Sequence, residues 1–486
     1  MVWGLMMRTK KIKRIVFIVI SIIALSLSCK VFSPIEESPS PTATPRPSAT
    51  ETSLPDIILM DSIGDPFSPE LGSSTYDVQN YLIQIRLNPE VIDHIEAVVE
   101  IEAFSLINSL SKMSLDFIGF DILDLTVDGI PANFERVGDK LVVDLPKPIS
   151  KNQNFSVLIS YDGEIVRRSS RYIPFEESIG MLFPDSKSLV VASEPDGARF
   201  WFPCNDHPRD KAIFRIEVTT PSKYLAASNG RLIETEEIAN SQTRFVWEHP
   251  FPMATYLATI VVGEYERFEQ MTENGILIRD YIFPEIQTSA FEAFSQTTEM
   301  LEWLESLLGP YPFDTYGHAT VNIPGFSLET QSMVVMSNMM LEEDIVIHEM
   351  THMWFGDWVS LDSWGEMWRN EGFASYFSWY WFYRDDLGAF NRDMASLTQD
   401  VLEVENLEAL GNLSPANLFS YESYTKGGVL VHALRLEVGE EAFFEGLKLY
   451  FNRYGGMTAS DEDFQMVMEE ASNLNLDEFF EEWLHN

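Results

Sequence analysis

Between residues 76 and 264 the chain alternates apolar and polar residues with a period near two. Short segments such as YLIQIRL, AVVEIEAF and FSVLISY are separated by turn residues, for example Asn229-Gly230. Asparagine and glycine tolerate the positive φ angles that tight turns between strands require. This pattern is typical of strands with one buried face, and it predicts an N-terminal antiparallel β domain over residues 76–264.

After Tyr265 the period changes. From Thr288 to Leu308 apolar residues recur every three or four positions, and this pattern ends at Gly309-Pro310, a helix stop signal. Two short apolar segments, HATVNI and SMVVMS, then indicate strands, and helical patterns follow to the end of the chain. We therefore expect a multidomain α+β fold, in which the β domain is followed by a mixed α/β and helical domain over residues 265–486.

The amino terminus has the pattern of an export signal. A basic stretch up to Arg14 precedes a short, mostly apolar run that is too short to span a bilayer, which predicts a signal peptide over residues 1–28. The following Cys29 completes a sequence similar to a bacterial lipoprotein cleavage box. We therefore expect an extracytoplasmic protein anchored to the cell membrane by lipid on Cys29; the alternative is ordinary cleavage near Ser28 and secretion. Residues 29–75 are rich in Pro, Ser and Thr and are predicted to form a tether.

The composition limits the partners. The 75 acidic and 33 basic residues give a net charge of −42, which repels nucleic acid and anionic lipid, so we expect no nucleic-acid partner and membrane contact only through the lipid anchor. The chain has two cysteines. If Cys29 is acylated, Cys204 has no partner, and we expect the protein to fold without a disulfide.

His348 and His352 lie four residues apart, with Glu349 next to the first histidine. On a helix the two imidazoles share one face, which is the H-E-x-x-H arrangement of zinc hydrolases. A catalytic zinc takes three protein ligands and keeps a fourth position for water, so a third ligand is needed. Glu371 is predicted to supply it, at the start of a second helix and with eighteen residues between it and His352. We expect one Zn²⁺ bound by His348, His352 and Glu371.

Two neutral imidazoles and one carboxylate leave a bound zinc ion with a net positive charge, which can lower the pKa of a bound water to about 7. Glu349 stands beside a ligand and cannot easily bind the same ion. It can take a proton from that water and pass it to a leaving amine. Glu349 is therefore the predicted general base.

The segments Trp354-Phe355-Gly356-Asp357 and Asn370-Glu371-Gly372-Phe373-Ala374 extend this pattern. With them the chain resembles the aminopeptidase N family of gluzincin zinc metallopeptidases, from about Tyr76 to its end, and is similar to a two-domain bacterial lipoprotein-like member. The resemblance implies a thermolysin-like zinc catalytic domain for residues 265–486. It also implies removal of N-terminal residues from peptides that have a free N-terminus.

The resemblance implies three further site residues. Glu329, in GFSLET, matches the family's amine-binding glutamate, and Glu194, in SEPDGAR, matches an acidic residue that reaches the site from the β domain. Tyr424, in YTKGG, matches the tyrosine that stabilises the transition state. The chain departs from the family pattern at Thr330, where asparagine is usual, and at Ala192, where glutamine is usual.

Two other functions remain open on the sequence. A thermolysin-like zinc endopeptidase would need a cleft open on both sides of the metal and no ammonium anchor, and Glu329 argues against it. A non-catalytic peptide-binding surface lipoprotein would not need the zinc ligands, Glu349 and Tyr424, all of which are intact.

Overall fold

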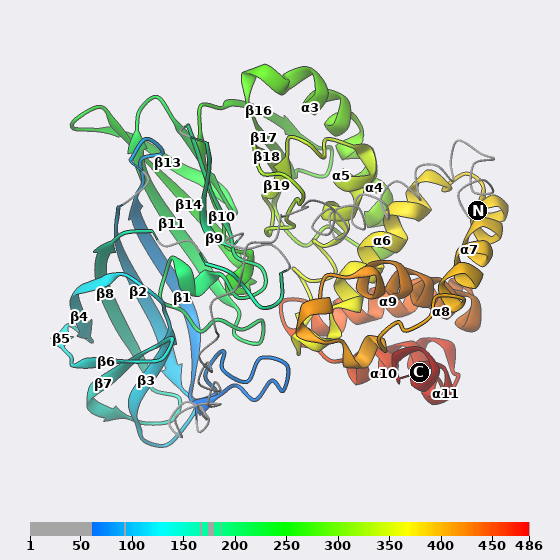
Figure 1. Cartoon of the computed structure of the whole chain (residues 1–486), viewed down its shortest axis with the longest axis horizontal. Coiled ribbons are helices and arrows are strands. Elements are labelled where there is room, and N and C mark those ends of the chain that lie inside the picture. Colours follow the sequence, from blue (N-terminus) through cyan, green and yellow to red (C-terminus); the bar gives the residue numbers. More distant parts are fainter. Residues whose placement is uncertain (1–60, 92–93, 166–167, 174–178, 186, 486) are drawn as a thin grey trace, which may run out of the picture.

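The computed structural model describes residues 61–485, except 92–93, 166–167, 174–178 and 186. The predicted signal peptide, Cys29 and most of the predicted tether lie outside the described residues. Within the described part, none of the helices combines the length and the apolar character that crossing a bilayer requires. The β domain lies on the left of Figure 1 and the helices of the second half on the right.

The largest element of the β domain is an eight-stranded sheet with the strand order β13-β14-β11-β1-β2-β8-β4-β5. Its described strands pair antiparallel with their neighbours, except β1 and β11, which are parallel. The predicted β domain is confirmed. Strands β1 and β11 can pair parallel because they lie far apart in the sequence and no hairpin between them sets their relative direction. The strands are β1 (Tyr76–Arg86), β2 (Ile95–Ser105), β4 (Asp121–Val127), β5 (Ile130–Pro131), β8 (Asn154–Gly163), β11 (Ala212–Pro221), β13 (Arg231–Ile238) and β14 (Gln242–Met253).

Two smaller sheets complete the β domain. Alternate residues of the long strands are buried, as in β2, where Ile95, Val99 and Ile101 face a core that the sheets share. The period-two pattern therefore marks the buried face correctly. The smaller sheets contain β12 (Leu225–Ser228), β15 (Ile260–Gly263), β10 (Ser188–Ala192) and β9 (Gly180–Asp185), and β3 (Leu110–Asp116), β7 (Lys140–Ile149) and β6 (Phe134–Val137).

The second half begins with a four-stranded sheet, β16-β17-β18-β19, and continues as a helical body around a second apolar core. The single helix expected from Thr288 to Leu308 is two helices, because a short 3-10 turn at Phe294–Gln296 interrupts it. The elements are β16 (Glu266–Met271), β17 (Leu277–Ile282), β18 (Thr315–Val321), β19 (Val334–Ser337), α3 (Gln287–Ala293), α4 (Thr297–Leu308), α5 (Glu343–Thr351), α6 (Trp368–Phe382), α7 (Leu387–Leu402), α8 (Gly427–Val438), α9 (Glu440–Tyr454), α10 (Asp461–Ser472), α11 (Asp477–His485) and the short pair β20 (Ser360–Leu361) and β21 (Thr458–Ala459).

The end of the predicted tether differs from the structure. Asp65 is fully buried and accepts hydrogen bonds from the Ser363 hydroxyl at 2.6 Å and the Trp364 backbone N–H at 3.3 Å. The His207 ring nitrogen lies 3.1 Å from the same carboxylate. The folded body therefore begins before Tyr76. Hydrogen bonds satisfy the buried polar groups of this segment and Leu71 is fully buried, but its few apolar residues form no periodic pattern that would predict this burial.

Side chains of the β domain hold the loop that follows α5. Arg209 donates to the Asp362 carbonyl at 2.7 Å and forms an ion pair with the Asp362 carboxylate at 2.8 Å. The Lys211 ammonium donates to the carbonyl of Asp357 at 2.8 Å and to that of Trp358 at 3.1 Å. The two halves therefore share the wall of one site.

Candidate active site

Helices α5 and α6 carry the predicted metal ligands. Glu343 and Asp344 stand in the first turn of α5, where acidic side chains complement the helix dipole. The indole N–H of Trp381, near the end of α6, donates to Glu343 at 2.7 Å, which sets the crossing of the two helices. The rings of Phe355 and Phe373 stack with 4.0 Å between their centroids and fix the other end of the crossing.

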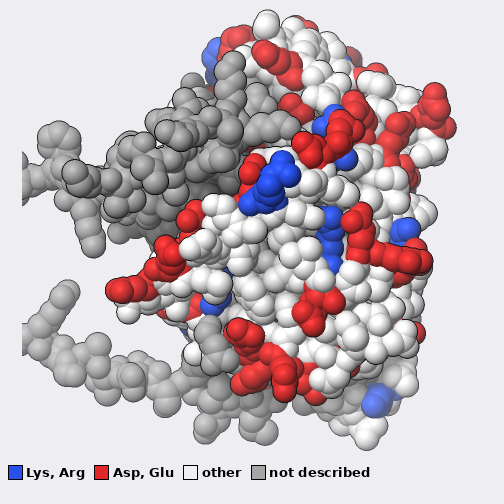
Figure 2. Space-filling model, turned by 90° about the vertical axis from the view of Figure 1, so that its right-hand side faces the viewer, with Lys and Arg blue, Asp and Glu red and all other residues white. Residues whose placement is uncertain are grey.

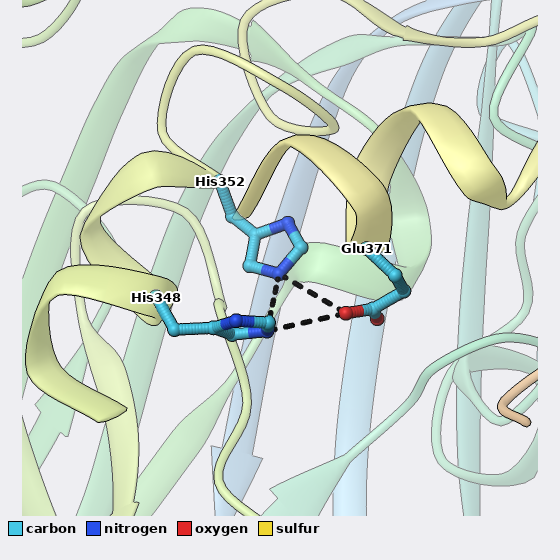
Figure 3. Close-up of side chains that lie close together, drawn as sticks. All are labelled: His348, His352 and Glu371. Carbon is cyan, nitrogen blue, oxygen red and sulfur yellow. Dashed lines mark hydrogen bonds and ion pairs between the residues drawn. The ribbon is translucent and has the colours of Figure 1, made fainter. Parts of the chain in front are cut away.

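This crossing brings His348, His352 and Glu371 together, with their side chains pointing to one position (Figure 3). The Nε2 atoms of the two histidines are 3.3 Å apart, and Glu371 Oε2 lies 3.2 Å from His348 Nε2 and 3.6 Å from His352 Nε2. A tetrahedral zinc ion with bonds of about 2.1 Å separates its ligand atoms by about 3.4 Å. The three residues therefore fit one zinc ion.

Hydrogen bonds and charge prepare these groups as ligands. The Nδ1 of His352 lies 3.2 Å from the Phe355 carbonyl, so it carries the proton and leaves Nε2 free to bind metal. Burial raises the pKa of Glu371, but the two imidazoles outweigh it and bring that pKa to about 2. Burial lowers the pKa of His352, but Glu329 and Glu371 outweigh it and bring it to about 10. The carboxylates thus favour positive charge at the ligand position, which a second proton on His352 supplies without metal and a metal ion would supply in place of that proton.

The other predicted acids lie beside this position and are buried. Ligand atoms of Glu329, Glu349 and His352 lie within 4.8 Å of one another, as do those of Glu194, Glu329 and Glu371. Burial and the neighbouring Glu329 carboxylate raise the pKa of Glu349 well above its usual range. They raise the pKa of Glu194 in the same way. A raised pKa suits Glu349, the predicted base, which must accept a proton near neutral pH, whereas Glu194 ionises more readily when a cation lies beside it.

The two acids that the resemblance assigns to amine binding come from different halves of the chain. Glu194 follows β10, in a loop where the Trp201 indole donates to the Ser193 hydroxyl at 3.1 Å. Glu329 lies in a loop closed on β19 by paired backbone hydrogen bonds of 2.9 Å between Leu328 and Val335. One oxygen of each acid, Oε1, is buried and has no hydrogen-bond partner in the described part of the chain. Both acids are therefore open to a cationic ligand.

Tyr424 lies in a single turn of π-helix at Glu422–Lys426, immediately before α8. Its ring is nearly parallel to that of His348, with 5.9 Å between centroids. The approach of α8 to α6 sets this position, because the two backbones meet at glycines: a Cβ on Gly372 would lie 2.7 Å from the Gly427 carbonyl carbon. Burial and Glu371 raise the pKa of Tyr424, so its hydroxyl stays protonated and can donate.

Sequence reasoning gave no role to three polar groups beside the site. Both carboxylate oxygens of Asp357 and both side-chain polar atoms of Asn370 are buried without a hydrogen-bond partner among the described residues. Burial lowers the pKa of the nearby Lys211 to about 7. A lone lysine at the start of a strand carries no local signal that separates it from a surface lysine, so Lys211 could not be found in the sequence.

The two departures from the family pattern are both buried. The Thr330 hydroxyl donates to the carbonyl of Met333 within its own loop, so it is not free to contact a peptide. Ala192 ends β10, is 2 % exposed and adds no polar group to the wall that carries Glu194. This part of the site therefore offers fewer hydrogen-bond donors than the family pattern.

The fold and this arrangement define a zinc metallopeptidase whose third metal ligand comes from the helix after the H-E-x-x-H helix. Family models agree: the Peptidase M1 N-terminal domain matches residues 74–257 and the Peptidase family M1 domain matches residues 292–483. The chain belongs to the M1 family of zinc metallopeptidases.

Solved structures and curated proteins place it within that family. A M1 zinc metallopeptidase from Deinococcus radiodurans is 26 % identical with a TM-score of 0.78, over 87 % of this chain and 97 % of that one. A mutant of the Deinococcus radiodurans enzyme, solved with a Tyr-Ser-Ala substrate, matches equally well, with 26 % identity, a TM-score of 0.78 and the same coverage of both chains.

Among curated proteins, glutamyl aminopeptidase of Homo sapiens is 28 % identical over 61 % of this chain and 34 % of its own length. Aminopeptidase M1-A of Oryza sativa subsp. japonica is 27 % identical over 64 % of this chain and 38 % of its own. The chain thus spans about a third of the length of these relatives.

Proposed function

We propose that this protein is a zinc-dependent aminopeptidase that removes N-terminal residues from peptides with a free N-terminus. The observation that carries the proposal is the meeting of Glu194 and Glu329 beside Glu371, with ligand atoms within 4.8 Å of one another. Two buried carboxylates, each with an oxygen that has no hydrogen-bond partner in the described part of the chain, are suited to a substrate ammonium group. They would hold this ammonium so that the first peptide bond of the substrate lies at the zinc. The glutamyl aminopeptidase and rice aminopeptidase likenesses support this substrate class.

His348, His352 and Glu371 would hold one catalytic zinc ion, which supplies Lewis-acid activation of water and of the scissile carbonyl. Glu349 takes the proton from the attacking water and delivers it to the leaving amine. The Tyr424 hydroxyl donates a hydrogen bond to the carbonyl oxygen as negative charge develops on it.

The buried carboxylates of Glu194 and Glu329 argue against a thermolysin-like endopeptidase, because an internal peptide segment has no ammonium group to pair with them. The intact ligand set and Glu349 argue against a non-catalytic peptide-binding protein. We further propose an extracytoplasmic location with a lipid anchor at Cys29, with secretion as the alternative. The basic and apolar N-terminal segment and its cysteine support this location.

The proposal is tested with a short peptide and its N-acetylated form, incubated with zinc-loaded protein. We expect cleavage of the free peptide one residue at a time and no cleavage of the acetylated peptide, because acetylation removes the ammonium charge. The variant Glu349→Gln should keep one zinc per chain and lose hydrolysis, because glutamine cannot accept the proton. Internal cleavage of both peptides would identify an endopeptidase, and full activity of Glu349→Gln would refute the assigned base.

A further inference from the structure

The proposed catalytic site contains more negative charge than its catalytic ion requires. Five carboxylates stand in or against the ligand cluster, and each of their residues is at most 7 % exposed: Glu194, Glu329, Glu349, Asp357 and Glu371. Within the described chain, Glu371 has ion pairs with the two histidines, whereas Glu194 and Glu329 have none. With all five ionised, one zinc ion and a protonated Lys211 would offset three of the five negative charges.

A substrate ammonium would offset one charge more, but only while a peptide is bound. Buried like charges in contact are costly unless a proton or a cation lies between them. The resting site is therefore expected to hold a shared proton or a small cation between these carboxylates.

The geometry is suitable for such an ion. Oxygens of Glu194, Glu329 and Glu371 lie within 4.8 Å of one another. One buried oxygen each of Glu194 and Glu329 has no hydrogen-bond partner among the residues that the structure describes. Divalent cations with bonds of about 2.1–2.5 Å to oxygen place ligands on opposite sides of the ion about 4.2–5 Å apart and adjacent ligands closer. Glu371 directs Oε2 to the histidines, which leaves its other oxygen for a second ion.

We propose that Glu194, Glu329 and Glu371 form a second, weaker divalent-cation site, and that an ion in this site excludes the substrate ammonium group. The all-oxygen ligand set favours hard cations such as Mn²⁺ over the nitrogen-preferring ions. The inhibitory part rests on the proposed aminopeptidase function, whereas binding of the second ion does not. Peptide and divalent cation would compete for the same two carboxylates.

The test adds Mn²⁺ to protein that already holds one zinc per chain. Bound Mn²⁺ is measured by electron paramagnetic resonance, and zinc content is measured in the same samples to show that the catalytic ion is not displaced. We expect wild-type protein to bind one Mn²⁺ more than Glu194→Gln or Glu329→Gln. With a free peptide as substrate, Mn²⁺ should raise KM at least severalfold in wild type while kcat stays constant, because the ion competes with the ammonium group.

The control is Glu217→Gln, which removes one equally buried carboxylate. Glu217 lies in β11 and pairs with Arg215 and Arg244, outside the ligand cluster. Acidic side chains form several groups on the helical face (Figure 2). Samples therefore contain 0.15 M salt to screen nonspecific attraction of Mn²⁺ to this surface, and variants are compared with one another. Glu217→Gln should retain the extra Mn²⁺.

The proposal is overturned if wild type binds no more Mn²⁺ than Glu194→Gln and Glu329→Gln, or if Mn²⁺ lowers kcat without changing KM. Failure of the aminopeptidase function is a separate result. A protein that binds the extra Mn²⁺ but cleaves no free peptide would keep the ion site and refute the function. A protein that cleaves free peptides but binds no extra Mn²⁺ would keep the aminopeptidase function and refute the second ion site.

Discussion

The contact between Gly372 and Gly427 should control activity more strongly than stability. A Cβ on Gly372 would lie 2.7 Å from the carbonyl carbon of Gly427 and 2.9 Å from its Cα, whereas ordinary carbon contacts are about 3.5–4.0 Å. In Gly372→Ala, α6 and α8 must therefore separate by about 1 Å. Glu371 is the residue before Gly372, and Tyr424 lies three residues before Gly427, where α8 begins. Separation of the two helices therefore moves the Glu371 and Tyr424 side chains apart.

The expected change in the free energy of unfolding is small, whereas the expected change in rate is large. Overpacking costs about 1–3 kcal/mol, and alanine regains about 1 kcal/mol of helix propensity, so we expect a net loss of stability of about 0–2 kcal/mol. A misplacement of about 1 Å at an active site can lower the rate about 100-fold. We therefore expect Gly372→Ala to bind zinc, to melt within a few degrees of wild type, and to lose about 100-fold in kcat/KM.

The assay is hydrolysis of an aminoacyl p-nitroanilide, with zinc content and melting temperature measured on the same samples. The matched control is Gly388→Ala in the first turn of α7, where the nearest atom to an added Cβ is the end of the Arg392 side chain at 3.4 Å. This control should keep full activity. If Gly372→Ala retains kcat/KM within twofold of wild type, the closeness of the two helices does not set the geometry of Tyr424 and the reasoning is wrong.

Two further substitutions separate catalysis from stability. Tyr424→Phe should lower kcat by about 10²–10³-fold with little change in KM or zinc content, because it removes a hydrogen-bond donor used in the transition state. Tyr421→Phe is the control and should leave kcat unchanged. Equal kcat values for the two variants would contradict the role assigned to Tyr424. Burial, with a smaller effect of Arg435, lowers the pKa of His432 to about 4. Because the unfolded chain takes up this proton first, at about pH 6.5, stability falls as the pH drops from 6.5 to 4. Chemical denaturation should show wild type losing about 2 kcal/mol more than His432→Gln between pH 7.5 and pH 5, and parallel curves would refute it.

The periodic patterns predicted most of the fold because they report one-sided burial. Strand β2 buries alternate residues, and α6 is buried nearly throughout, as its apolar sequence indicates. The break between α3 and α4 was missed because a 3-10 turn changes the backbone hydrogen bonds without changing the apolar period. The parallel pairing of β1 with β11 was missed because the sequence of a strand does not record the direction of a distant partner.

In the candidate site, too, residues with a local sequence pattern could be predicted, whereas contacts between distant segments could not. His348, Glu349 and His352 are recognisable because one helix turn sets their spacing, and the structure brings Glu371 within 3.6 Å of both histidines. The contact of Lys211 with the Asp357 carbonyl depends on how the two halves dock, for which no short sequence pattern exists. The roles of the site residues in catalysis stay predictions that the variants above test.

The hydrogen bonds of Lys211 to the loop after α5 join residues about 146 positions apart in the sequence. Contacts of such long range form late in folding, since the loop-closure entropy must be overcome before they give any stability. The loop that orients His352 is thus held in its final position only after the β domain has docked. Zinc affinity should therefore rise at the end of refolding, and the time course of metal uptake would report the docking of the two halves rather than the formation of either one.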